Sequence, residues 1–167
     1  ICKIGNINHV IRSIHIINQR NDKYSNELLS VSLKSVNGDK KVLAKELFKR
    51  FDKYNKNIQI AIIKFLSEYN YIKTDKLIAK VKNNYTQIDV RCEILRYFEK
   101  NKNDDLMIYL FNMLNKKELT PNDFTLKAIG TLGYYENSKV EKLLDRLKNF
   151  DNSRIKWMAH ISIETME

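Results

Sequence analysis

Apolar residues recur at helical spacing in four segments that align without gaps. Each segment opens with Asn or Asp, and its main apolar positions then stand four residues apart. The four segments begin at Asn57, Asp89, Asp123 and Asn152. Side chains at positions i and i+4 lie on one face of a helix. The pattern therefore predicts four amphipathic helices, each opened by an Asn or Asp that accepts first-turn N–H bonds or opposes the positive helix end.

Two core positions recur in all four segments, and they predict which side chains each helix buries. The first position holds Ile62, Ile94, Ala128 and Trp157. The second follows four residues later and holds Leu66, Phe98, Leu132 and Ile161. We expect Trp157 to fill the last interface of the fold or to cover one of its ends.

A second amphipathic helix is predicted after each of the first three segments. These helices fall at residues 74–83, 105–116 and 138–149, with apolar positions Leu77, Ile78, Val81, Leu106, Leu110, Met113, Leu114, Val140, Leu143, Leu144 and Leu147. The repeated unit is thus a helical hairpin, and its starts lie 32, 34 and 29 residues apart. Because one hairpin cannot bury both of its apolar faces alone, we expect several hairpins to stack in a row.

The residues before Asn57 predict further helices. Residues 25–36 and 39–53 are typical of another hairpin, with Asn37 and Gly38 forming the turn. Residues 1–24 predict an N-terminal helix. Its apolar positions are Ile7, Val10, Ile11, Ile14 and Ile17. The β-branched side chains in this segment leave a strand as the alternative.

The predicted fold is all-α: a right-handed α-solenoid of stacked antiparallel helix pairs, in a single domain over residues 1–167. Its predicted parts are an N-terminal helix at 1–24, helix pairs at 25–56, 57–87, 88–119 and 120–151, and a terminal helix at 152–167. We expect this domain to be a fragment of a longer protein, because the chain starts at Ile1 and still has a helical pattern where it ends.

Composition argues against several other classes of protein. The chain has only 4 Gly and 1 Pro in 167 residues, too few turn formers for a fold of many short strands. Its apolar runs are only a few residues long, far short of the ~18 that a membrane span needs. Cys2, Cys92, His9, His15 and His160 form no ligand motif, so neither a disulfide scaffold nor a metal site is expected. Two unpaired thiols favour a reducing, cytoplasmic setting.

The net charge of +10 is concentrated in the first half of the chain. Residues 1–83 carry 17 basic and 7 acidic side chains, whereas residues 84–167 carry 13 of each. Codon bias explains part of the lysine excess, because Ile, Lys, Asn and Tyr share AT-rich codons and make up 71 of the 167 residues. The bias does not explain the asymmetry, so the location of the lysines is more informative than their number.

Short motifs add to the repetition. Asp89-Val90-Arg91 opens one segment, Ala128-Ile129 and Leu132-Gly133 close the next, and Arg154 falls in register with Arg91. With these motifs the chain resembles the HEAT and HEAT-like (armadillo-type) helical repeats over residues 57–165. The period is closer to the ~34 residues of tetratricopeptide repeats, whose small second-helix residues are replaced here by Val and Leu. The resemblance implies a binding scaffold whose second helices line an extended concave surface.

Lysines are the candidate binding residues. Four of them stand at successive i+4 positions along one predicted helix, and three more accompany the following second helix. They are Lys41, Lys45, Lys49 and Lys53, then Lys73, Lys76 and Lys80. Like charges at this spacing mildly destabilise a helix, and the sequence offsets one pair through Glu46 and Arg50. If second helices line a concave surface, as the resemblance implies, both sets lie side by side in one basic groove. The alternative is a solvated lysine face enriched by codon bias.

The expected function is a non-enzymatic scaffold whose basic half contacts an acidic surface or segment of a partner protein. Nucleic acid and an anionic membrane surface are the alternative partners, since both present negative charge. Some HEAT-like proteins are DNA glycosylases that use Trp, Arg and a catalytic Asp. Here Trp157 lies in the neutral half, and only Asp52 and Asp75 stand beside the lysines. No cofactor, metal ion or small-molecule substrate is expected.

Overall fold

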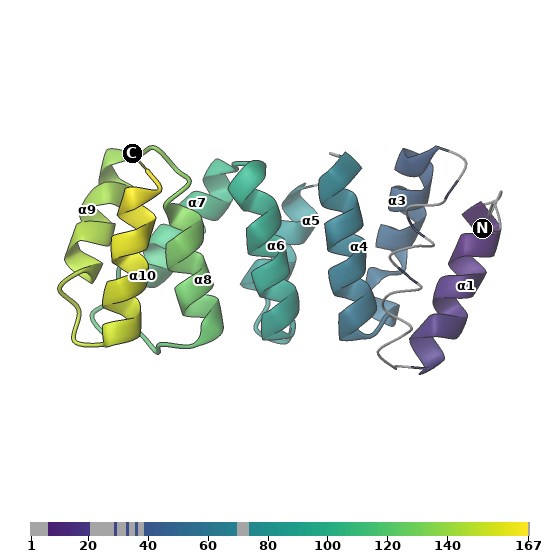
Figure 1. Ribbon diagram of the computed structural model, residues 1–167, viewed down its shortest axis with the longest axis horizontal. Coiled ribbons are helices and arrows are strands. Elements are labelled where there is room, and N and C mark those ends of the chain that lie inside the picture. Colours follow the sequence, from purple (N-terminus) through teal and green to yellow (C-terminus); the bar gives the residue numbers. More distant parts are fainter. Residues whose placement is uncertain are drawn as a thin grey trace. The chain divides into compact units, whose positions relative to one another are not determined.

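The computed structural model describes residues 7–20, 29, 33, 36, 39–69 and 74–166. All regular structure in these residues is helical, and none of them forms a strand (Figure 1). The all-α class is therefore confirmed for the described residues. The chain divides into two compact units, Ile1–Lys73 and Thr74–Glu167. The single domain over residues 1–167 stays a prediction.

Four helical elements of the first unit have described bounds, and the described residues Leu29 and Leu33 are also helical. The four elements are α1 (Ile7–Arg20), α3 (Lys40–Lys49), the short 3-10 helix η1 (Phe51–Lys53) and α4 (Lys56–Tyr69). The first of them is a helix and not a strand, and it buries Val10, Ile11, Ile14 and Ile17 as predicted. α3 and α4 pack on each other. Asn18 ties α1 to the start of α4, because its Oδ1 accepts the Asn55 N–H at 2.7 Å.

Much of the first predicted hairpin lies outside the described residues. Between residues 25 and 36, only Leu29, Leu33 and Val36 are described, and all three are buried at helical spacing. Asn37 and Gly38, which the sequence predicts as the turn, also lie outside them.

α3 ends four residues before the end of the predicted 39–53 helix. It begins where predicted, at Asp39, whose side chain accepts two first-turn N–H groups. After α3 the chain tightens into η1. The side-chain amide of Gln59 on α4 donates to the carbonyl oxygens of Phe51 and Tyr54, at 3.0 Å each. This contact holds the short 3-10 helix against α4 and explains why the longer helix does not form.

In the second unit, the described residues form six helices. They are α5 (Thr74–Lys82), α6 (Ile88–Lys100), α7 (Asp104–Leu114), α8 (Asp123–Leu132), α9 (Ser138–Leu147) and α10 (Ser153–Glu164). The three predicted second helices are confirmed as α5, α7 and α9. They bury every apolar side chain predicted for them except Met113, which is partly exposed.

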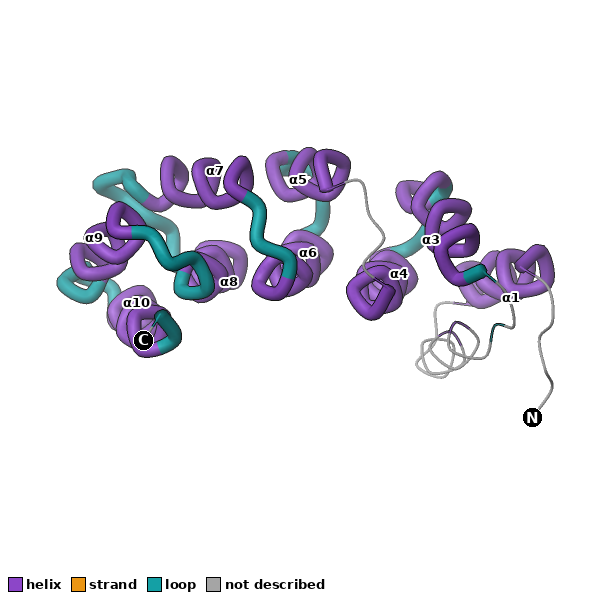
Figure 2. Tube along the Cα trace, turned by 90° about the horizontal axis from the view of Figure 1, so that it is seen from above, coloured by secondary structure: helices purple, strands orange, loops and turns teal. Residues whose placement is uncertain are grey.

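Helices of the second unit lie in two rows (Figure 2). α6, α8 and α10 pack closely side by side, whereas the row of α5, α7 and α9 has only sparse contacts between its members. A stack bends toward its more closely spaced row, so the second helices lie on the outer side of this unit. The resemblance implies the opposite placement, on a concave side.

N-terminal caps set the register of the first helices of the pairs. Asn122 and Asn152 accept first-turn N–H groups, and Asn55 accepts the Ile58 N–H in the same way. Gln87 holds the equivalent position before α6 without a side-chain bond. The third and seventh residues after these four positions are all buried: Ile58, Ile62, Val90, Ile94, Thr125, Ile129, Ile155 and Ala159.

This register corrects the predicted helix openings. Asn152 is an N-cap, as predicted. Asp123 instead follows the cap, and Asn57 and Asp89 lie inside the first turn of their helices. The apolar residues of a helix keep the same spacing whether the Asn or Asp before them is the N-cap or a first-turn residue. The pattern alone therefore does not distinguish a cap from a first-turn residue.

The burial of Trp157 is also corrected. The core positions of the other three segments are buried as predicted, but Trp157 is 63% exposed and Ala159 occupies the core of α10. The ungapped alignment placed α10 two residues out of register. Trp157 and Ile161 repeat at helical spacing, yet they belong to a more exposed stripe of the helix.

α8 and α10 lie in close contact at Gly133, the residue that caps the end of α8. A Cβ atom added there would lie 2.5 Å from the carbonyl oxygen of Ser162. That atom belongs to the backbone of α10, so the two helices would have to separate. Gly130, one turn earlier, has room for a Cβ, since its nearest neighbour is the Met158 sulfur at 3.4 Å.

We therefore predict opposite effects for two glycine substitutions on one helix. Gly133→Ala should lower the free energy of unfolding by about 1–3 kcal/mol, because overpacking forces a backbone shift. Gly130→Ala should raise it by about 0.5–1 kcal/mol, because Ala is a better helix former than Gly. Urea unfolding followed by circular dichroism measures both. Equal effects from the two variants would contradict the close packing of α8 on α10.

Candidate functional site

Three of the candidate lysines share the exposed face of α3. Lys41, Lys45 and Lys49 are exposed, while the opposite face of the helix is buried through Leu43, Ala44 and Leu47. Neither Lys41 nor Lys45 forms an ion pair with any described residue. The stripe that the sequence predicts on this helix is therefore present and open to solvent over its first three positions.

The last two positions of the predicted stripe differ from expectation. Glu46 forms its ion pair with Lys49, at 2.6 Å, and the charge of Arg50 acts on the same carboxyl from further away. This hydrogen bond lowers the pKa of the Glu46 carboxyl below its usual value. Lys53 is exposed, but it lies in η1 beyond the end of α3. The four lysines thus belong to two elements instead of one continuous helix.

The second group of candidate lysines is divided by the boundary between the units. Lys73 lies outside the described residues. Lys76 is exposed and Lys80 half-buried, and both belong to α5 of the second unit. The α3 and α5 lysines therefore stand in different compact units, and the basic groove that would join them stays a prediction.

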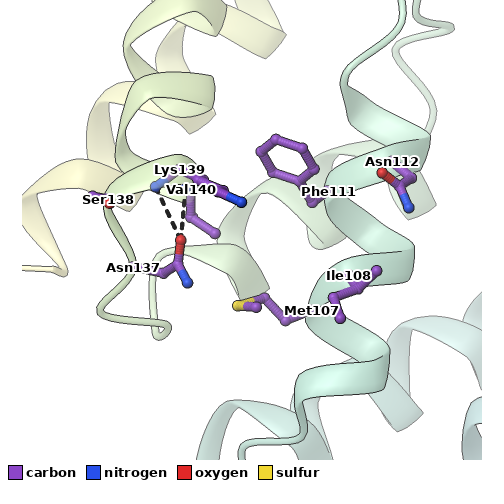
Figure 3. Close-up of a pocket in the computed structure, with 8 residues that line it drawn as sticks. All are labelled: Met107, Ile108, Phe111, Asn112, Asn137, Ser138, Lys139 and Val140. Carbon is purple, nitrogen blue, oxygen red and sulfur yellow. Dashed lines mark hydrogen bonds between the residues drawn. The ribbon is translucent and has the colours of Figure 1, made fainter.

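A pocket of about 420 Å³ opens between α7 and α9 of the second unit (Figure 3). Its apolar lining consists of Met107, Ile108, Phe111 and Val140. The Ile108 side chain is 52% exposed although it is large and apolar. The pocket follows from the sparse contacts between α7 and α9, and it has the size and lining to accept an apolar side chain from outside.

Polar groups surround this apolar lining. Asn137 caps α9, with its Oδ1 accepting the N–H groups of Lys139 and Val140 at 2.9 and 3.4 Å (Figure 3). Asn112 and Ser138 complete the rim. The lining therefore offers amides, one hydroxyl and one ammonium group around an apolar floor.

Two arginines join successive helix pairs of the second unit. The Arg91 Nε donates to the carbonyl oxygen of Val81 at the end of α5, at 2.9 Å. Arg146 likewise donates to Leu114 at the end of α7, at 2.9 Å. A cation at a helix C-terminus is favourable because it opposes the negative end of the helix dipole. In the sequence, Arg91 stands out only as part of the Asp89-Val90-Arg91 motif, and its burial against the Phe124 ring was not predicted.

The remaining candidate residues do not assemble into a reactive site. In the part of the chain that the structure describes, no three His, Cys, Asp or Glu side chains come together as metal ligands. His9 and His15 are exposed, and His160 lies 3.7 Å from the Glu164 carboxylate on the surface of α10. Asp52 and Asp75, the acids that stand beside the lysines, belong to different units.

Comparison with known proteins identifies no relative: no family model, curated protein or solved structure matches the chain. The resemblance to HEAT-like repeats therefore depends on the repeated pattern of this sequence alone. Among the described residues, no helix combines the length and the apolar character needed to cross a bilayer.

Cys92 lies half-buried on α6. Burial raises the pKa of its thiol to about 11, and the nearby Asp123 carboxylate acts in the same direction. Because thiolate is the reactive form, this thiol is protected from alkylation at neutral pH. As pH rises, the unfolded chain loses the thiol proton at a lower pH than the folded protein does. The protonated thiol therefore favours the folded state below pH 9. This contribution to the free energy of unfolding is lost between pH 9 and about 11.

We predict that Cys92 reacts slowly with iodoacetamide while the protein is folded. In a Cys2→Ser variant, alkylation at pH 8 should be on the order of 100-fold slower than in the same chain unfolded in urea, as the difference in thiolate fraction requires. The folded rate should keep rising up to about pH 11, whereas the unfolded rate should level off near pH 9. Mass spectrometry at timed intervals measures both rates, and identical pH profiles would contradict the protected position.

Proposed function

We propose that this chain is a non-enzymatic, HEAT-like repeat scaffold that binds an acidic partner protein through its basic N-terminal half. The exposed lysine face of α3 carries the proposal. Lys41 and Lys45 on α3, and Lys53 just beyond it in η1, are exposed and form no ion pair with any described residue, whereas Lys49 pairs with Glu46. Unpaired charges on a rigid helix are available to an incoming acidic surface with little reorganisation.

The charge of the first unit supports the same proposal. Its described residues include ten basic and four acidic side chains, whereas residues 74–167 carry 16 basic and 14 acidic ones. An uneven charge distribution steers an oppositely charged partner to one part of the surface and raises the association rate. The effect should weaken as salt increases, because exposed charges are screened over ~8–10 Å at physiological ionic strength.

The helix pairs support the scaffold part of the proposal. In the second unit, each first helix packs against the next first helix, from α6 to α8 to α10. Side-by-side packing of successive pairs is what an α-solenoid requires, and a right-handed stack of HEAT-like pairs is the arrangement that we propose for the whole chain. The α7–α9 pocket favours a binding role over an enzymatic one.

A nucleic-acid partner is the second candidate, and the net charge of +10 favours it. Its weakness is the side-chain chemistry, because the chain has 23 Lys but only 7 Arg. Sequence reading in the major groove relies on bidentate contacts from Arg to guanine. A duplex would therefore be held through its phosphates, with little discrimination between sequences.

The test compares a charge reversal on α3 with a matched reversal elsewhere. Lys41→Glu/Lys45→Glu changes the net charge by the same amount as Lys117→Glu/Lys142→Glu, and all four lysines are exposed and without an ion pair among the described residues. We expect fluorescein-labelled poly-glutamate to bind the unchanged protein at low salt. The α3 variant should bind it on the order of tenfold more weakly, as expected for two lost charge contacts, and the control within about twofold of the unchanged protein.

A 20-base-pair DNA duplex in the same anisotropy assay separates the two candidates. Duplex binding tighter than poly-glutamate binding, with a log–log salt slope of several units, would favour the nucleic-acid candidate. If both double variants weaken poly-glutamate binding equally, the net charge of the protein alone explains the binding. In that case α3 would hold no binding surface.

A further inference from the structure

A second groove of the 74–167 unit, about 560 Å³ in volume, is rich in hydrogen-bond donors. It lies beside the C-terminal end of α7 and the start of α8. The residues that matter for its chemistry are Arg91, Tyr109, Asn112, Lys116 and Glu118. Asn112 also lines the α7–α9 pocket, so α7 separates an apolar pocket from a polar groove.

Arg91 is the most unusual member of this groove because it is a charged residue with only 7% of its surface exposed. Its guanidinium carbon lies 3.6 Å from the centre of the Phe124 ring. Its Nε donates to the Val81 carbonyl oxygen, and this is the only hydrogen bond that the Arg91 side chain makes to any described residue. The two terminal nitrogens are therefore left without a protein acceptor at the groove.

The terminal nitrogens of Arg91 reach the solvent of the groove, because no buried side-chain nitrogen or oxygen of the described residues lacks a hydrogen-bond partner. An acidic partner is the usual neighbour of a guanidinium in a residue this buried, since a charge away from water is costly. No described carboxylate forms an ion pair with Arg91, and Glu118, which also lines the groove, is not bonded to it. Two contacts nevertheless fix the plane of the guanidinium: the bond to Val81 and the stacking on Phe124. The fork that Arg uses to bind two oxygens of one acid is thus held in place before any ligand arrives.

Neighbouring side chains add further donors that no described group uses. The Tyr109 hydroxyl and the Asn112 amide make no hydrogen bond to any described residue. The Lys82 ammonium lies over the Tyr109 ring, 5.5 Å from its centre. The Lys116 ammonium is likewise unpaired within the described residues. Three kinds of donor therefore line the same groove as the Arg91 fork.

We propose that the Arg91 groove binds a carboxylate of a partner peptide. Two cations and one anion line it, which gives a formal charge of +1 and matches a single carboxylate better than a phosphate dianion. The carboxylate oxygens would accept the two terminal Arg91 N–H groups, with Lys116 and Tyr109 as additional donors. The groove is open along its length, which suits a residue within an extended chain or at its C-terminus. This site involves no lysine of α3 and goes beyond the proposed function.

Short peptides test the carboxylate directly in the full chain. Chemical shifts of the 15N-labelled protein, including the side-chain Nε–H signal of Arg91, would be followed during titration with Ac-Gly-Gly-Glu-Gly-Gly-amide. The matched probe replaces Glu by Gln and keeps the amide end. We expect the Glu peptide to bind at least about fivefold more tightly than the Gln peptide and to shift the Arg91 signal. Equal affinities for the two peptides would exclude a side-chain carboxylate, and the proposal would be overturned if a free C-terminal carboxylate then bound no more tightly than either.

Two further probes identify the source of the acid. The Gln peptide with a free C-terminal carboxylate tests a chain terminus, and its tighter binding than the amidated form would support the proposal from that source. The phosphoserine peptide tests a dianion. If phosphoserine or inorganic phosphate binds more tightly than every carboxylate probe, the groove is an anion site of another kind and the proposal is wrong.

Variants locate the binding within the groove. Lys116→Ala and Tyr109→Phe should each weaken binding of the tighter-binding carboxylate peptide by about threefold or more, through loss of one donor. Lys117→Ala is the matched control, since Lys117 is the exposed neighbour of Lys116 and does not line the groove. It should leave the affinity unchanged. Equal effects from Lys116→Ala and Lys117→Ala would overturn the assignment.

Arg91→Lys keeps the charge but removes the fork, and we expect it to abolish detectable binding of that peptide. Circular dichroism would establish that this variant is folded. If it does not fold, the Lys116, Tyr109 and Lys117 variants decide the question, because none of them removes a bond that joins two helices. Unchanged binding in folded Arg91→Lys would show that the carboxylate does not use Arg91.

Discussion

Burial of apolar surface between successive helix pairs is the interaction on which the second unit depends. A single hairpin leaves one apolar face of each first helix uncovered, and α6, α8 and α10 cover these faces by packing on one another. Gly133 lets α8 approach the backbone of α10, and Arg91 and Arg146 tie helix ends across pairs. The grooves beside α7 are consequences of this packing, because close contact in one row leaves the other row open.

Helical periodicity predicted the described helices, apart from the break before η1, and the buried side chains of α5, α7 and α9, apart from Met113. It was not sufficient to set the register of α10, where two apolar stripes compete. The pattern placed Trp157 in the core, whereas the Asn152 cap places Ile155 and Ala159 there. An N-cap identifies one residue as the start of the helix, whereas a periodic apolar pattern fits the helix in more than one register. Counting from caps instead of from apolar positions would have found the correct register.

The candidate surfaces differ in how far the sequence reveals them. Exposure of Lys41 and Lys45 follows from their position opposite the apolar face of α3. The η1 break before Lys53 depends on Gln59, which belongs to the following helix and contributes no local signal. Arg91 stands next to buried Val90, but its stacking partner Phe124 comes from a helix 33 residues later in the chain. Periodicity and spacing along the sequence do not predict contacts of this kind between distant segments.

Unequal spacing of the two rows has a mechanical consequence for the second unit. α6, α8 and α10 pack closely on one another, so bending of this unit would change mainly the spaces between α5, α7 and α9. The pocket between α7 and α9, lined by Ile108 and Val140, would then widen or narrow with the bend. A partner side chain bound in this pocket would favour one degree of bending over the others.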